Sequence, residues 1–157
     1  MNPLWHRLLP FFFLFLACKT SKMNESYLGE RSLIQLKKDP VCEWLNGPLP
    51  SLDASVLEAL RKKDPSRYSY KIYMGCWCED SERLLPSFLA LAREFNIPQK
   101  NIRFIALDAD KRSPEKLEEA DKVTFVPTFI VYDGDREIGR IVEIASPNLE
   151  SVLLGIL

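Results

Sequence analysis

The sequence is poor in histidine and carries no excess of positive charge. Its single histidine is His6, and its 21 basic and 22 acidic residues give a formal net charge of −1. This balance lacks the polycationic signature of nucleic-acid-binding proteins, so we expect no nucleic acid partner. The chain also has no internal repeat, low-complexity block or long run of like charges. A length of 157 residues with 46% hydrophobic residues is typical of one globular domain.

The apolar run at the N-terminus is too short to cross a membrane. It covers residues 8–17, ten residues in all, whereas a transmembrane helix needs about 20. An apolar run of this length after Arg7 is typical of a secretory signal. The small Ala17 followed by Cys18 and polar residues resembles a bacterial lipoprotein signal. The resemblance implies removal of a signal peptide at 1–17 and lipidation of Cys18. An ordinary secretory signal or an uncleaved anchor, with Cys18 uninvolved, is the alternative.

Removal of this segment would also remove His6. A mature protein without histidine has no Cys–His nucleophile pair, no Ser–His–Asp triad and no histidine-ligated metal site. Thiol chemistry is then the main candidate, and we expect neither a metal nor an organic cofactor. The protein would lie in the cell envelope, anchored by lipid to the periplasmic or another extracytoplasmic face of a membrane.

Hydrophobic periodicity divides the rest of the chain into two parts. Residues 18–50 are predicted to form a polar tether and an N-terminal extension, and residues 51–157 a domain. Local patterns in that domain predict helices at 51–64, 79–95, 113–122 and 146–157, strands at 68–74 and 102–108, and a hairpin over 128–143 that turns at Asp133–Gly134. This order predicts an α/β fold with a central mixed sheet flanked by helices.

Four features of this domain, in this order, resemble the thioredoxin family. They are the Trp77–Cys78 pair after the first strand, Pro86 eight residues beyond Cys78, the loop Val126-Pro127-Thr128, and the terminal hairpin. In the family, the first proline kinks the active-site helix and the second is cis. The resemblance covers about residues 50–157 and implies a thioredoxin-like fold. Another α/β fold with a chance Trp–Cys pair is the alternative.

The motif departs from the dithiol pattern of the family. Trp77-Cys78-Glu79-Asp80-Ser81 has a serine where dithiol members carry the second, resolving cysteine. Ile72 also stands where many thioredoxins carry a buried acid. A second thiol occurs instead at Cys76, two residues before the expected nucleophile.

The position of Cys78 predicts a modestly activated nucleophile. A helix N-terminus favours the thiolate through its unpaired N–H groups and its dipole, and Ser81 could donate a hydrogen bond to it. Glu79 and Asp80 oppose this by adding negative charge. The alternative is a buried structural cysteine.

The sequence leaves the partner of Cys78 open. In an extended segment Cys76 would point the same way as Cys78, with Cα atoms about 6.6 Å apart. A disulfide at that spacing would need a local bend and would be strained and oxidising. Otherwise Cys76 is only a small residue beside the site. Cys42 is either a resolving thiol from the N-terminal extension or a buried, apolar-like cysteine beside Trp44.

These observations predict a membrane-anchored thiol–disulfide oxidoreductase that contributes to cell redox homeostasis. Cys78 would attack a disulfide, and Cys76, Cys42 or an external thiol would resolve the mixed disulfide. The resemblance implies that the backbone of Val126, before Pro127, pairs with the bound peptide. Partners would be protein or small-molecule thiols and disulfides.

Two other functions remain as alternatives. The first is a non-catalytic binding or chaperone-like module that uses the surface at Trp77 and Val126–Pro127. The second is a Cu(I) site formed by Cys76 and Cys78 near Met74, because soft thiolates suit that ion. The motif has no histidine or methionine within it to complete such a site.

Overall fold

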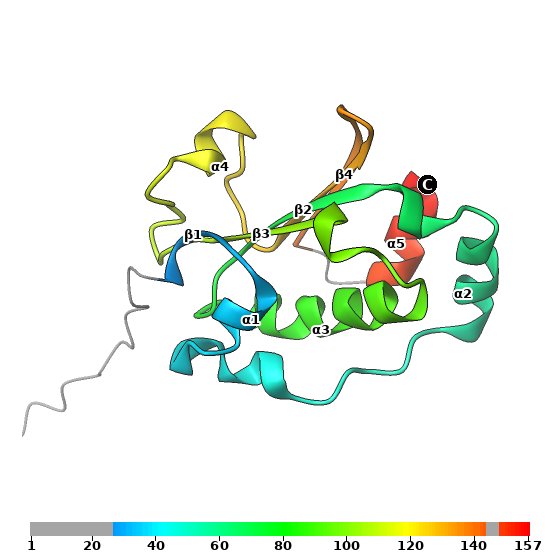
Figure 1. Cartoon of the computed structure of the whole chain (residues 1–157), viewed down its shortest axis with the longest axis horizontal. Coiled ribbons are helices and arrows are strands. Elements are labelled where there is room, and N and C mark those ends of the chain that lie inside the picture. Colours follow the sequence, from blue (N-terminus) through cyan, green and yellow to red (C-terminus); the bar gives the residue numbers. More distant parts are fainter. Residues whose placement is uncertain (1–26, 144–147) are drawn as a thin grey trace, which may run out of the picture.

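The computed structural model describes residues 27–143 and 148–157. Its centre is one five-stranded sheet with the order β1-β3-β2-β4-β5 (Figure 1). The strands are β1 (Gly29–Arg31), β2 (Ser69–Met74), β3 (Ile102–Ala106), β4 (Thr128–Asp133) and β5 (Arg136–Val142). β2 and β3 are parallel and the other neighbours are antiparallel, so the predicted mixed sheet is confirmed. The predicted signal peptide and Cys18 lie outside the described residues.

Helices cover both faces of the sheet. The α-helices are α1 (Leu33–Leu36), α2 (Ala54–Arg61), α3 (Glu79–Glu94), α4 (Leu117–Ala120) and α5 (Leu149–Ile156), and the 3₁₀ helices are η2 (Pro40–Asn46), η3 (Pro65–Arg67) and η4 (Gln99–Asn101). Figure 1 shows α1, α3 and α5 on one side of the sheet and α4 on the other. Among the helices in the described part of the chain, none has both the length and the apolar character that a membrane span requires.

Alternation along the strands divides the buried side chains into two cores. The first core lies under α3 and includes Ile72, Met74, Phe88 and Phe129. The second core, on the opposite face, consists of Tyr73, Ile105, Leu107, Val123, Val126 and Ile130. Successive residues of a strand point to opposite faces, which explains why neighbours such as Ile72 and Tyr73 belong to different cores.

The N-terminal extension is part of the same folded unit from residue 27 onward. β1 pairs antiparallel with the edge strand β3, with Gly29 opposite Ala106. α1 begins at a capping box, in which the Ser32 hydroxyl oxygen accepts the Gln35 N–H and the Gln35 side chain accepts the Ser32 N–H. η2 follows and contacts α3. The extension therefore brings Cys42 to the α3 side of the sheet.

Three predicted helices begin later than expected: α2 begins at Ala54, α4 at Leu117 and α5 at Leu149. The helix predicted over 113–122 covers only α4, because Lys116 has a left-handed φ of 53° that interrupts a helix started at Pro114. Ser113 instead forms local bonds: its hydroxyl donates to Glu118 Oε2 at 2.5 Å and its oxygen accepts the Leu117 N–H at 3.0 Å. The last helix is capped by Asn148, whose side chain accepts the Ser151 N–H.

Candidate active site

The site begins where β2 ends and the chain turns into α3. Cys78 donates its N–H to the Gly75 carbonyl at 3.0 Å, which closes a tight turn, and its own carbonyl accepts the Glu82 N–H. Cys78 is the N-cap residue of α3. The prediction that Cys78 lies at a helix N-terminus is therefore confirmed.

Gly75 and Trp77 determine the shape of this turn. The indole Nε1 of Trp77 donates to the Leu107 carbonyl at 3.0 Å, which folds the ring back over the turn. A Cβ on Gly75 would lie 2.6 Å from Cε2 of that ring, closer than real Cβ contacts come. Only glycine at position 75 leaves room for the indole in this orientation.

The Cys78 thiol faces the loop that carries the second family proline. Cys78 is half-buried, and its Sγ lies 3.3 Å from the Val126 carbonyl oxygen, to which the thiol donates. The Val126–Pro127 peptide bond is cis, as the resemblance implies. Val126 is buried, whereas the side chain of its neighbour Phe125 is 48% exposed. The structure thus brings Cys78, Val126 and Pro127 together at one surface.

Ser81 is buried beneath the turn. Its oxygen accepts the Gly75 N–H at 3.2 Å, so the residue in the position of the missing second cysteine orients the backbone before the nucleophile. Donation of a hydrogen bond from Ser81 to a Cys78 thiolate stays a prediction.

Cys76 is joined to Cys42 by a disulfide. The two Cα atoms are 4.7 Å apart, within the normal range for a disulfide, and the residues are 34 positions apart in sequence. Both side chains are buried, with 0% of Cys42 and 4% of Cys76 exposed. Among the described residues, Cys78 is the free cysteine. Cys42 is therefore part of a disulfide and not the isolated apolar-like residue that the sequence left as one option.

The orientation expected for Cys76 is wrong. Residues 76 and 77 form the turn and are not extended, so Cys76 packs in the first core while Cys78 packs against the second. The two side chains consequently lie on opposite faces of the sheet. The Cu(I) alternative would need Cys76 as a free thiolate, whereas here its sulfur is bonded to Cys42.

Trp44, in η2, is a contact of the site to which the sequence assigned no role. Its indole Nε1 donates to the Cys76 carbonyl at 3.0 Å. η2 is thus attached to the turn twice, through the disulfide and through this hydrogen bond. The nearness of Trp44 to Cys42 in sequence was the available signal, but only the packing of η2 shows what the indole binds.

A polar network on the second face supports the segment that leads to Val126. The Tyr73 hydroxyl has two acceptors within hydrogen-bond distance, Asp121 Oδ2 at 2.6 Å and the Leu117 carbonyl at 2.9 Å. Lys71 Nζ lies 2.7 Å from the same carboxylate oxygen. Arg140 donates to the Asp121 carbonyl at 3.0 Å. β2 and β5 together therefore hold the backbone of residues 117–121.

This network shifts the pKa values of Tyr73 and Asp121. Burial raises the pKa of Tyr73, and the hydrogen bond to Asp121 raises it further. Burial acts to raise the pKa of Asp121 as well, but hydrogen bonds from Lys71 and Tyr73 outweigh it and leave that pKa below its ordinary value. Asp121 is thus held as a carboxylate. The sequence did not identify this group, because its members come from separate elements.

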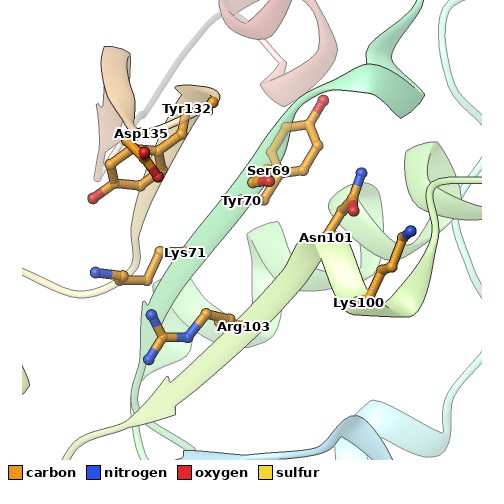
Figure 2. Close-up of a pocket in the computed structure, with 9 residues that line it drawn as sticks. Ser69, Tyr70, Lys71, Lys100, Asn101, Arg103, Tyr132 and Asp135 are labelled. Carbon is orange, nitrogen blue, oxygen red and sulfur yellow. The ribbon is translucent and has the colours of Figure 1, made fainter.

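A pocket of about 280 Å³ lies away from the thiol, at the beginning of β2. Figure 2 shows its side chains coming from β2, η4, β3 and the β4–β5 hairpin. Two of the cations that line it, Lys71 and Arg103, are paired within the protein, with Asp121 at 2.7 Å and with Glu30 at 2.8 Å. These ion pairs hold parts of the sheet together, and the pocket is not part of the site at Cys78.

Comparisons with known proteins found several that are named thioredoxins. The chain is 31% identical over 91 residues to a thioredoxin from Echinococcus granulosus, a match that covers 58% of this chain and 78% of that protein. Similar solved structures include a thioredoxin from Fasciola hepatica (26% identity, TM-score 0.37, 57% of this chain and 80% of that one) and oxidised mitochondrial thioredoxin 3 from Saccharomyces cerevisiae (24% identity, TM-score 0.41, 64% and 87%). No family model matches the chain.

The match to the thioredoxin from Echinococcus granulosus covers more than two thirds of that protein. The observed sheet order and the position of Cys78 at the N-terminus of α3 are consistent with the same fold. The predicted thioredoxin-like fold is confirmed, and the chain belongs to the thioredoxin family.

Proposed function

We propose that this protein is a thiol–disulfide oxidoreductase in which Cys78 is the nucleophile. The observation that carries the proposal is the half-buried free thiol at the N-terminus of α3, facing the cis Val126–Pro127 loop. The thiolate is the attacking form in disulfide exchange, and Cys78 is the free cysteine among the described residues. The thioredoxin relative supports the same chemistry.

The reaction exchanges one disulfide for another. The Cys78 thiolate attacks one sulfur of a substrate disulfide, a bond forms between the two sulfurs, and the other substrate sulfur leaves as a thiolate that takes up a proton. A second thiol then breaks this mixed disulfide and returns Cys78 to the thiolate. Val126 would pair its backbone with a bound polypeptide, and the exposed Phe125 beside it offers apolar contact. Trp77 and Ser81 keep the turn in the geometry that presents the thiol.

The location is part of the proposal. Cys18 would carry the lipid, and the polar residues that follow it would connect it to the folded part of the chain. The sequence pattern at Ala17–Cys18 supports this location, and so does the buried Cys42–Cys76 disulfide, since such bonds persist in oxidising compartments. Cys18→Ala should abolish labelling with a radioactive fatty acid and leave the precursor uncleaved. Unchanged labelling would contradict the lipid anchor.

A direct test compares Cys78→Ser with the wild-type chain in the reduction of a fluorescent mixed disulfide. We expect the variant to lose exchange, because a hydroxyl does not form a disulfide. Wild-type protein alkylated once at Cys78 is the matched control and should lose exchange equally. If neither the wild-type chain nor Cys78→Ser accelerates exchange and both bind reduced polypeptides, the protein is instead a non-catalytic binding module.

A further inference from the structure

After Cys78 attacks a substrate, a thiol is needed to release it, and the structure limits where that thiol can come from. The described cysteines are Cys42, Cys76 and Cys78, and the first two are bonded to each other. A disulfide has no thiolate with which to attack. On the basis of the proposed function, we propose that Cys78 works as a one-cysteine centre whose mixed disulfide is resolved by an external thiol, while Cys42–Cys76 is a clamp that stays closed.

The geometry of the turn separates the clamp from the reaction. Cys76 points into the first core and Cys78 toward the second, so their sulfurs lie on opposite faces of the sheet. Contact between them would require the turn to open. That opening would break the bond between the Cys78 N–H and the Gly75 carbonyl and the bond between Trp77 and the Leu107 carbonyl.

Burial protects the clamp from external reductants. Cys42 is 0% exposed and Cys76 is 4% exposed, whereas Cys78 is half-buried at the surface. Thiol–disulfide exchange needs direct access of the attacking sulfur. An external thiol therefore meets Cys78 first and leaves the buried pair intact. The hydroxyl of Ser81, one turn beyond Cys78 and buried, takes no part in electron transfer.

The balance of the cycle follows from this arrangement. In the first step the Cys78 thiolate displaces one half of the substrate disulfide as a thiolate and keeps the other half as a mixed disulfide. In the second step the external thiolate attacks the substrate sulfur of that mixed disulfide, forms a new disulfide with it, and expels the Cys78 thiolate. One disulfide is consumed and one is formed, and Cys42–Cys76 is unchanged.

The test uses the full chain in detergent and follows the glutathione adduct of Cys78. Glutathione disulfide is added and removed, and intact-mass spectrometry with peptide mapping then locates the adduct. Among the three described cysteines we expect an adduct at Cys78 alone, which persists without thiol and is discharged by reduced glutathione, free cysteine or a reduced protein thiol. Tenfold more thiol should discharge it about tenfold faster. Differences among the three thiols would identify which source serves the site.

Two results would overturn the inference. Spontaneous loss of the adduct with formation of a disulfide between Cys78 and Cys76 or Cys42 would show that an internal thiol resolves it. Alkylation of Cys42 and Cys76 as fast as Cys78 under native reducing conditions would show that the clamp opens. Failure to form any adduct at Cys78 is a different outcome, because it contradicts the proposed function itself.

Ser81→Cys provides an independent test, because it restores the dithiol spacing of the family. The introduced thiol should discharge the adduct at a rate independent of added thiol. Ser87→Cys, further along the same helix, is the matched control and should behave like the wild-type chain. Equal, thiol-independent discharge in the wild-type chain and Ser81→Cys would contradict the one-cysteine centre. If Ser81→Cys does not fold, the wild-type measurements decide.

Discussion

At the scale of single residues, a few side chains around the turn determine how the thiol is presented. The Ser81 oxygen accepts the Gly75 N–H, and the Trp77 indole donates to the Leu107 carbonyl. Cys78 itself contributes only its sulfur and its backbone bonds. Presentation of the nucleophile thus depends on neighbours that carry out no chemistry.

Gly75→Ala tests this dependence. The added Cβ would overlap the Trp77 ring, so we expect the indole to move and its hydrogen bond to be lost, at a cost of about 1–2 kcal/mol in the free energy of unfolding. Denaturant titration followed by tryptophan fluorescence measures both effects. Gly155→Ala is the control: position 155 lies in α5 with no heavy atom within 4 Å of a new Cβ. There we expect stabilisation of up to about 1 kcal/mol, because alanine is the better helix former. Equal losses in both variants would contradict this account.

At the scale of elements, the short helix η2 is the part of the N-terminal extension that reaches the site. Asp39 caps it by accepting the Val41 N–H at 2.9 Å, with Pro40 following as the first helical residue. Through Cys42 and Trp44, η2 is then attached to the turn that precedes α3. An element outside the region of family resemblance therefore supports the active-site turn.

Removal of this covalent link should destabilise the fold more than removal of the free thiol. For a disulfide between residues 34 apart, the chain-entropy relation gives about 3–4 kcal/mol. We expect the double variant Cys42→Ala, Cys76→Ala to lose about that much free energy of unfolding, as measured by urea titration. Cys78→Ala is the control and should change stability by less than about 1 kcal/mol, because Cys78 lies at the surface. A double variant as stable as the wild type would show that η2 stays in place without the bond.

At the scale of the whole molecule, the network around Asp121 connects β2 and β5 to the segment that leads to Val126. Lys71 and Tyr73 come from β2 and Arg140 from β5, while Asp121 directly follows α4. The pKa of Asp121 is lowered in the folded protein, because the hydrogen bonds from Lys71 and Tyr73 outweigh the effect of burial. Its ordinary value is about 3.9.

This shift predicts the sign of a pH dependence. A carboxyl whose pKa is lower in the folded state stabilises the fold above its unfolded value and loses that contribution as pH falls through the folded value. We therefore expect the free energy of unfolding of the wild type to decrease when the pH drops below about 4. We expect Asp121→Asn to be less stable than the wild type at pH 7, and its free energy of unfolding to decrease less steeply in acid. Urea titrations from neutral to acidic pH measure both. Asp135→Asn, in the exposed β4–β5 turn, controls for the loss of one negative charge. The prediction would be contradicted if the free energy of unfolding of Asp121→Asn decreased in acid as steeply as that of the wild type.

Sequence alone was enough for the features that depend on neighbouring residues. From α2 onward, the order of the main helices and strands follows from local periodicity, turn residues and spacing, as do the hairpin at Asp133–Gly134 and the position of Cys78 at the start of α3. The edge strand β1 was not predicted. The resemblance added the cis bond at Val126–Pro127. These features could be predicted because the forces behind them act over a few residues.

Only the tertiary structure decided which distant residues meet. The pairing of Cys76 with Cys42 depends on the packing of η2 against α3, and the opposite orientations of Cys76 and Cys78 depend on a turn that the strand pattern does not encode. The Asp121 network and the late start of α4 likewise arise from contacts of side chains with their folded surroundings. Such contacts depend on how whole elements pack, and local patterns in the chain do not specify that packing.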